Sequence, residues 1–202
     1  MRNKMSAYLS DISRIHHRAA FTDVKHHTNP KTSLFAKLVR KRSSCRKFSD
    51  ASVFDEEISQ IIEVARLAPS AKNLQPVHVW VVRSPEAMEK LKTATTSLYG
   101  APVVFMVGCK SEEAWVRACD GKNGAETDAA IVGTHILLQA KALKLGSVWV
   151  GSFDPAKIKE AFPETAGWEI TALFPVGHPA KDATPSPMHD KRKSAEEFSS
   201  EL

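Results

Sequence analysis

The chain is poor in cysteine, and its three cysteines are not spaced as ligands or as disulfide partners. Cys45, Cys109 and Cys119 form an odd set without a CxxC pair. This pattern argues against a disulfide framework and against a zinc or iron–sulfur site built on cysteines. We therefore expect a reducing, cytoplasmic compartment. Cys45 is interpreted as a small buried residue, with a reactive thiol between two arginines as the alternative.

Long apolar runs are also missing. No stretch reaches the roughly 18 apolar residues that a membrane-spanning helix requires, so no membrane partner is expected. The first ten residues carry basic side chains without an apolar block behind them, which is not the pattern of a secretory signal, whereas an organelle transit peptide stays open as an alternative. The 202 residues, 43% of them apolar and four of them Trp, suffice for one domain with an ordinary core and extensions.

The charge is distributed unevenly. Residues 1–47 carry 12 Lys or Arg against 2 Asp or Glu, whereas the remainder carries 16 against 21. This asymmetry predicts a basic N-terminal extension over residues 1–32 and a domain over residues 33–202 that includes the C-terminal tail. We favour a solvated arm over a polyanion-binding leader, so a nucleic-acid partner is not expected. The pairs His16-His17 and His26-His27 lack a third fixed ligand, and no metal site is predicted.

Hydrophobic periodicity predicts a mixture of helices and strands. Apolar residues recur at helical spacing after Ser33, which predicts a short helix that leads into the basic segment. They recur again from Asp55, which predicts a second helix that ends at Pro69. Further helices are expected over 85–98, 127–145 and 155–162, and strands over 77–82, 103–107, 147–150 and 169–176. The segment 110–124 is expected to be a loop or short helix, and the tail from Gly177 shows no core pattern. The prediction is an α+β or mixed α/β fold with helices on both sides of a sheet.

Two short segments carry the candidate chemistry, and the first is cationic. It reads Arg42-Ser43-Ser44-Cys45-Arg46-Lys47-Phe48. Arg42 and Arg46 are four residues apart, so helical geometry would place them on one side of a turn. A planar guanidinium makes bidentate bonds to phosphate, and serine hydroxyls add donors. From spacing alone, a phosphate site and plain surface charge are equally good interpretations.

The second segment, Ala68 to Pro76, is a small-residue turn with two amides, Asn73 and Gln75. Both amides can donate and accept, which suits the polar edge of a flavin ring, although helix-capping amides are the simpler interpretation. A later segment, Val148 to Ser152, offers a strand end followed by a glycine that allows close approach to a ring. Its alternative is core packing by Trp149.

Taken together, these segments resemble the flavin-dependent nitroreductase family. The first motif matches the family pattern except that Ser43 replaces a second Arg or His, and the second matches except that Val77 replaces a Trp. A long helix from Asp128 then leads into Leu145-Gly146-Ser147-Val148-Trp149-Val150-Gly151, and Pro175-Val176-Gly177-His178-Pro179 follows. A basic run, Lys191-Arg192-Lys193, precedes Ser194-Ala195-Glu196-Glu197-Phe198. The resemblance covers residues 34–198.

The resemblance implies a nitroreductase-like fold, with a central, mostly antiparallel sheet flanked by helices in an intertwined homodimer, and FMN bound non-covalently between the subunits. The implied cofactor-binding residues are Arg42, Ser43, Ser44, Arg46, Pro69, Ser70, Asn73, Gln75, Val150, Gly151, Ser152 and Arg192. Arg192 and the first motif would hold the phosphate, and Ser43 leaves the detailed phosphate geometry open.

The implied reaction is hydride transfer from NADH or NADPH through flavin N5 to a nitroaromatic, a quinone or a similar acceptor. No general base is nominated, and Lys72 is interpreted as an exposed turn lysine. Two alternatives stay open. One is a flavin enzyme of the same fold with other chemistry, such as dehalogenation or flavin cleavage. The other is a non-catalytic flavin-binding module whose leader binds a polyanion.

Overall fold

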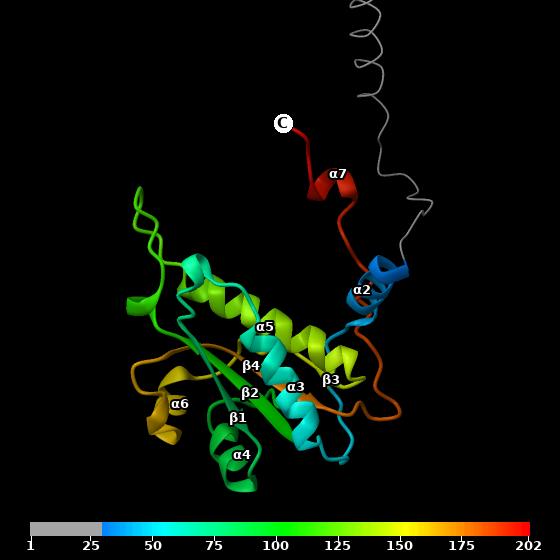
Figure 1. Ribbon diagram of the computed structural model, residues 1–202. Helices are drawn as coiled ribbons and strands as arrows, with labels where there is room; N and C mark the ends of the chain where they lie inside the picture. Colours follow the sequence, from blue (N-terminus) through cyan, green and yellow to red (C-terminus); the bar gives the residue numbers. More distant parts are fainter. Residues whose placement is uncertain (1–29) are drawn as a thin grey trace, which may run out of the picture.

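The computed structural model describes residues 30–202 (Figure 1). The predicted N-terminal extension, residues 1–32, lies almost wholly outside the described residues, as do the two histidine pairs. These predictions are therefore untested.

The centre of the domain is a four-stranded antiparallel sheet in the order β1-β2-β4-β3. Its strands are β1 (Val77–Val82), β2 (Val103–Cys109), β3 (Gly146–Ser147) and β4 (Glu169–Gly177). All seven residues of β2 are buried, because layers cover both faces of this central strand. β3 is shorter than predicted. The chain leaves the ladder at Val148, and only Val150 returns, in an isolated bridge to Leu173.

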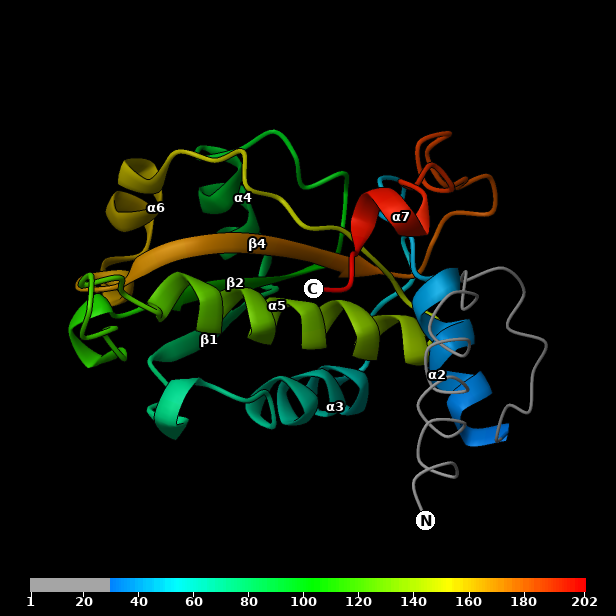
Figure 2. The same cartoon turned by 90° about the horizontal axis from the view of Figure 1, so that it is seen from above.

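Helices cover both faces of the sheet (Figure 2). On one side lie α3 (Asp55–Arg66) and α5 (Ala125–Ala142), and on the other lie α4 (Pro85–Lys92) and α6 (Pro155–Ala161). The mixed α+β prediction is thereby confirmed. Ser84 and Asp154 cap α4 and α6 through their side-chain oxygens, each with proline at the first helical position.

One predicted helix ends early. Helix α4 was expected to reach Leu98 but ends at Lys92. The residues that follow include Thr93, Thr95 and Thr96, and the Thr95 hydroxyl donates to the Ser152 carbonyl at 2.7 Å. Hydroxyl side chains that bond to backbone groups favour non-helical chain, which explains the early end. Leu98 is nevertheless buried in the loop.

The core consists of two apolar clusters, one on each face of the sheet. Phe105 and Phe174 lie in the cluster under α3 and α5, whereas Met106 and Leu173 lie in the cluster under α4 and α6. Gly133 lets α5 approach the sheet closely, because a Cβ there would lie 2.3 Å from Cζ of Phe174. The longest helix is therefore packed directly on the sheet.

Two terminal helices contribute little to this core. α2 (Pro30–Lys41) has the predicted apolar residues, but Leu34 and Phe35 are 67% and 61% exposed. α7 (Ala195–Phe198) was not predicted. It forms because Ser194 and Glu197 make a capping box, and it stands apart from the sheet (Figure 1) with Phe198 84% exposed. These apolar residues are not covered within the described chain.

Candidate functional site

The first motif is extended rather than helical. α2 ends at Lys41, and Ser44 then forms a parallel bridge with Ser147 while the Cys45 N–H donates to the Ser147 carbonyl at 2.9 Å. Successive side chains of an extended segment alternate between two sides. The helical argument for pairing Arg42 with Arg46 was therefore wrong, yet the two residues still share a side because their spacing is even.

Three arginine residues line one cavity. Arg42, Ser44 and Arg46 from the first motif meet Arg192 from the tail around a cavity of about 240 Å³, which is completed by Ser186, Met188 and His189. Among the described residues, no carboxylate lines this cavity. The grouping of Arg42 and Arg46 with distant Arg192, which the family resemblance implied, thus corresponds to a spatial cluster, which we call the three-arginine pocket.

The tail is folded so that Arg192 reaches this pocket. The His189 N–H donates to the Ser186 carbonyl at 2.8 Å, and the Arg192 guanidinium donates to the carbonyls of His189 and Lys191. His189 Nε2 lies 3.3 Å from the Arg40 carbonyl, which joins the tail to α2. Sequence reasoning missed His189 and Ser186, because a Pro- and Ser-rich tail carries no periodic signal.

Ser43 is placed differently from its neighbours. It lines a second cavity, of about 210 Å³, together with Arg42, Ser44 and Lys141, but unlike Arg42 and Ser44 it does not line the three-arginine pocket. Cys45 is buried against β3, where a Cβ on Gly146 would lie 2.7 Å from its Sγ atom. The close approach of this strand to the motif explains why a glycine occupies position 146.

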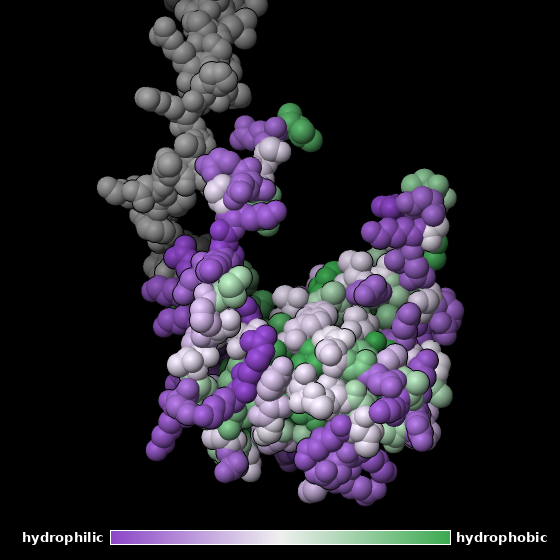
Figure 3. All heavy atoms as spheres, turned by 180° about the vertical axis from the view of Figure 1, so that it is seen from behind, coloured by the Kyte–Doolittle hydropathy of each residue, from purple (hydrophilic) through white to green (hydrophobic). Residues whose placement is uncertain are grey.

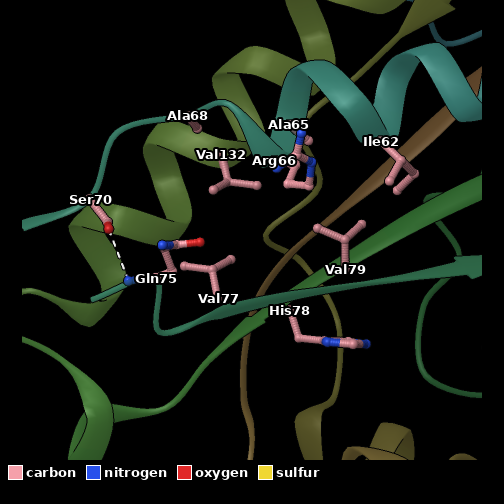
Figure 4. Close-up of a pocket in the computed structure, with 10 residues that line it drawn as sticks. All are labelled: Ile62, Ala65, Arg66, Ala68, Ser70, Gln75, Val77, His78, Val79 and Val132. Carbon is pink, nitrogen blue, oxygen red and sulfur yellow. Dashed lines mark hydrogen bonds between the residues drawn. The ribbon is translucent and has the colours of Figure 1, made fainter. Parts of the chain in front are cut away.

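The second motif forms a tight turn with an unusual backbone. Lys72, Asn73 and Gln75 have φ angles of 53°, 55° and 54°, in the left-handed region that non-glycine residues seldom adopt. The Ser70 hydroxyl accepts from the Gln75 N–H at 2.9 Å (Figure 4), and the Ser70 carbonyl accepts from the Asn73 N–H at 2.9 Å. Strain of this kind is stored where surrounding contacts fix the chain, often at functional sites.

A buried carboxylate of α5 accepts a hydrogen bond from the backbone of this turn. Asp128, in the first turn of α5, is 3% exposed, and its Oδ1 accepts from the Ala71 N–H at 3.1 Å. Its Oδ2 is buried without a hydrogen-bond partner in the part of the chain that the structure describes. Sequence reasoning treated Asp128 only as part of a helix pattern, since nothing local indicates its contact with residue 71.

A largely apolar cavity of about 210 Å³ lies beside the turn (Figure 4). In Figure 4, Val77 and Val79 of β1 point towards α3, whereas His78 points to the opposite side of the strand. Ser70 and Gln75 supply polar groups at one end. Cavities of this character, apolar with a few polar groups, are typical of sites for small organic molecules.

The two motifs lie at opposite ends of α5. Asp128 contacts the second motif, whereas Lys141 lines a cavity with Arg42 and Ser43 of the first. These α5 positions are 13 residues apart, which corresponds to about 20 Å at 1.5 Å per residue. The structure therefore does not bring the predicted residues of the two motifs together within one chain.

The third predicted segment follows β3 and runs beside β4 at the edge of the sheet. The Val150 side chain is buried in the cluster under α4 and α6, and its backbone N–H and carbonyl both bond to Leu173, whereas Gly151 and Ser152 are exposed. Trp149 packs edge-on against Phe174, with ring centroids 4.8 Å apart. Trp149 is nevertheless 37% exposed, so the core interpretation of this residue holds only in part.

Cations near the second motif are mostly paired. Arg66, beside the apolar cavity, bonds Glu63, and this carboxylate raises the pKa of the guanidinium. The backbone N–H of Lys110 donates to the Pro76 carbonyl. Its side-chain ammonium bonds the Glu113 carboxylate at 2.7 Å, and this bond raises the pKa of the ammonium. Lys72 has no carboxylate partner within the described chain.

Comparison with known proteins agrees with this arrangement. The sequence model of the nitroreductase family matches residues 39–99 and 94–178, which is more than half of the chain. The chain belongs to the nitroreductase family. It is therefore an oxidoreductase, and its fold is the nitroreductase fold.

Individual relatives support the assignment to the nitroreductase family. A protein of Archaeoglobus fulgidus, named provisionally as an NADH dehydrogenase/NAD(P)H nitroreductase, is 34% identical over 65% of this chain and 75% of its own length. The crystal structure of a nitroreductase family protein from Clostridium difficile has a TM-score of 0.76 and 34% identity, covering 81% of this chain and 95% of that one. A provisionally named nitroreductase from Desulfovibrio desulfuricans, crystallised with FMN, has a TM-score of 0.68 and 28% identity, covering 87% and 98%.

Among residues 30–202, no three His, Cys, Asp or Glu side chains are grouped as metal ligands. The same residues include no helix of sufficient length and apolarity to cross a membrane.

Proposed function

We propose that the protein is an FMN-dependent oxidoreductase that takes a hydride from NADH or NADPH and reduces a nitroaromatic, a quinone or a similar small acceptor. The three-arginine pocket carries this proposal. Arg42, Arg46 and Arg192 line one small cavity, and no carboxylate from residues 30–202 lines it, as a phosphate dianion requires. The D. desulfuricans relative, crystallised with FMN, supports the choice of cofactor.

The residues of this chain fit FMN in three places. Arg42, Ser44, Arg46 and Arg192 would hold the phosphate, with Ser43 assigned to the neighbouring cavity. The turn from Pro69 through Ser70, Asn73 and Gln75 would present its amides to the ring edge. The exposed backbone at Gly151 and Ser152, with that of Val150, would approach the ring closely.

Bound FMN would supply the redox chemistry, accepting a hydride at N5 and passing two electrons to the acceptor, with protons from solvent completing its reduction. The protein's part is binding and orientation. Cationic groups near the ring would favour the reduced, anionic flavin, and no side chain is assigned as a general base. We place this activity in the cytoplasm, where nicotinamide nucleotides are available and the three free thiols stay reduced.

We also propose a homodimer, because one chain alone separates the two motifs. α5 is apolar around much of its circumference, and Ile131, His135 and Leu138 stay partly exposed, a composition typical of a helix that is covered on all sides. Figure 3 shows a wide hollow between two hydrophilic projections, with apolar and weakly polar residues on its floor. A second copy packed over α5 would place its second motif beside the first motif of this chain.

The cofactor assignment is tested by an absorbance spectrum and by FMN titration. Purified protein should show flavin absorbance, bind FMN and oxidise NADH or NADPH when an acceptor is present. Arg46→Ala and Arg192→Ala should each weaken FMN binding by about 10- to 100-fold, since a charge-assisted hydrogen bond contributes about 1.5–3 kcal/mol. Arg40→Ala is the matched control, because Arg40 is exposed and lines neither cavity. Colourless protein that takes up no FMN would refute the proposal.

The shared site is tested by complementation. Arg46→Ala on one copy and Asn73→Gly on the other should give a mixed dimer with one intact site, if each site combines the first motif of one copy with the second of its partner. Glycine is chosen at position 73 because it tolerates φ 55°. The mixed dimer should recover about half of the FMN binding sites, whereas a homodimer of either single variant should recover none. Failure to recover any would show that both motifs serve the same site from one chain.

A further inference from the structure

We propose that Lys72 makes the enzyme selective for anionic acceptors, so that it prefers substrates bearing a carboxylate or a similar group over uncharged ones. This inference rests on the proposed function, because it assumes that the second motif borders the flavin. It assigns a role to a side chain that the cofactor does not need.

The first support is that the backbone of the turn at Lys72 is held in one conformation. Hydrogen bonds on both sides of it tie down the turn, from the Ala71 N–H to Asp128 and from the Gln75 N–H to the Ser70 hydroxyl. Lys72 itself has φ 53°, a conformation that costs a non-glycine residue of the order of 1 kcal/mol. A lysine kept in this conformation, where glycine or asparagine would fit more easily, points to a use for its side chain.

The second support is the charge balance around the turn. Arg66 and Lys110 lie near the second motif, and each has a carboxylate partner at 2.7 Å. Arg117, on the loop that precedes α5, is likewise paired with Asp120. Lys72 is exposed and has no such partner within the described residues. Its ammonium is therefore free to attract an anion from solvent.

The third support is position. Lys72 stands directly between Ala71 and Asn73, in the turn that also supplies Ser70 and Gln75 to the lining of the apolar cavity. The flexible four-carbon stem of a lysine lets its ammonium reach past the turn without moving the backbone. An aromatic acceptor beside the flavin would then place its own substituent within reach of this charge.

The test compares two acceptors that differ only in charge, 4-nitrobenzoate and 4-nitrobenzamide, at fixed NADH. A unit charge acting across a partly solvated site contributes about 1 kcal/mol, or about fivefold in kcat/KM. Lys72→Gln should lower the ratio of kcat/KM for nitrobenzoate to that for nitrobenzamide by about fivefold. Lys72→Glu should lower it further, and Lys72→Arg should preserve it. Raising the ionic strength should reduce the preference of the unaltered enzyme.

Lys144→Gln is the matched control. Lys144 is also an exposed lysine with a positive φ, of 64°, but it follows the far end of α5. Its substitution should leave the ratio unchanged. A second readout is independent of turnover, namely isothermal titration calorimetry of the FMN-loaded protein with benzoate and benzamide, which have no reducible group. Lys72→Gln should raise the Kd for benzoate about fivefold and leave that for benzamide unchanged.

The two proposals fail in distinguishable ways. If the unaltered protein binds no FMN, or reduces neither these two acceptors nor a quinone, the proposed function falls, and this inference with it. If it reduces both acceptors and Lys72→Gln leaves their ratio and the benzoate Kd unchanged, only the role of Lys72 is wrong. Loss of FMN from Lys72→Gln but not from Lys72→Arg would assign the cation to the cofactor and would also overturn the inference.

Discussion

Oδ1 of Asp128 accepts a hydrogen bond from the Ala71 N–H at 3.1 Å, across 57 positions of sequence. This bond connects the first turn of α5 to the strained turn of the second motif. The other carboxylate oxygen of Asp128 is buried without a partner in the described residues. The carboxylate thus stabilises the turn at a cost to its own solvation.

The first prediction concerns this bond. Asp128→Ala should weaken FMN binding about tenfold, because a bond to a charged acceptor contributes about 1.5–3 kcal/mol and the turn would lose its support. The free energy of unfolding without FMN should change by less than about 1 kcal/mol, since removing the unpartnered oxygen offsets the lost bond. Asp128→Asn, which retains an acceptor, should bind FMN within about threefold of the unaltered protein.

Hydrogen exchange provides the control for that prediction. The Ala71 amide should exchange faster in Asp128→Ala, whereas the Ile158 amide in α6, which donates to the Asp154 carbonyl, should keep its rate. Equal acceleration at both amides would indicate global destabilisation and would contradict a local role for Asp128.

The second prediction contrasts two glycines. Gly133→Ala should destabilise the protein by about 1–3 kcal/mol, because the new methyl group would overlap Phe174 and Trp149 in a packed core. Gly151→Ala should leave stability nearly unchanged, since the nearest atom to its added Cβ is 4.0 Å away, but should weaken FMN binding if this backbone borders the ring. Urea unfolding and FMN titration measure the two effects. Equal destabilisation by both substitutions would be inconsistent with the packing described.

The third prediction concerns the thiols. Cys119 is exposed, whereas Cys45 and Cys109 are buried, and burial also raises the pKa of the Cys109 thiol. Iodoacetamide should therefore modify Cys119 first, and the other two only as the protein unfolds, because the thiolate is the reactive form. Peptide mass spectrometry over time checks this order. Early modification of Cys45 in folded protein would contradict its burial against Gly146.

The fourth prediction concerns pH. The Lys47 ammonium beside Asp182 holds the pKa of that carboxyl below its ordinary value of 3.8. A lowered folded-state pKa means that the stabilisation is present above the ordinary value and is lost as pH falls through the lower one. Asp182→Asn should lower Tm slightly near neutral pH, and the difference should vanish in strong acid. A Tm difference that grows with acidity would have the wrong sign. Both side chains are exposed, so the effect is small.

The sequence predicted the fold well where the signals were local. The helix from Asp55, the strand from Val77 and the N-cap at Asp154 all depend on neighbours in sequence, and the structure confirms them. The helix expected to reach Leu98 was too long, because the Thr95 hydroxyl bonds the Ser152 carbonyl of a distant segment. The strand expected to reach Val150 is continuous only over Gly146–Ser147, and Val150 pairs with Leu173 in an isolated bridge.

The residues of the candidate site also divide into those with a local sequence signal and those without one. The spacing of Arg42 and Arg46 identified two cationic groups of one pocket, although the reasoning assumed a helix where the chain is extended. The family pattern was needed to bring in Arg192, because its distance in sequence carries no physical signal. Asp128 and His189 escaped notice because each acts through a contact with a residue far along the chain.

In the proposed dimer, each α5 would have one end at each of the two flavins. The helix contacts the second motif near Asp128 and borders the first near Lys141, and these motifs would serve different sites. A single rigid rod would then span from one reaction centre to the other in each subunit. If ligand binding at one site tilted this helix, the residues at the other site would also be displaced. The two chemically identical sites could then differ in their affinity for the ligand.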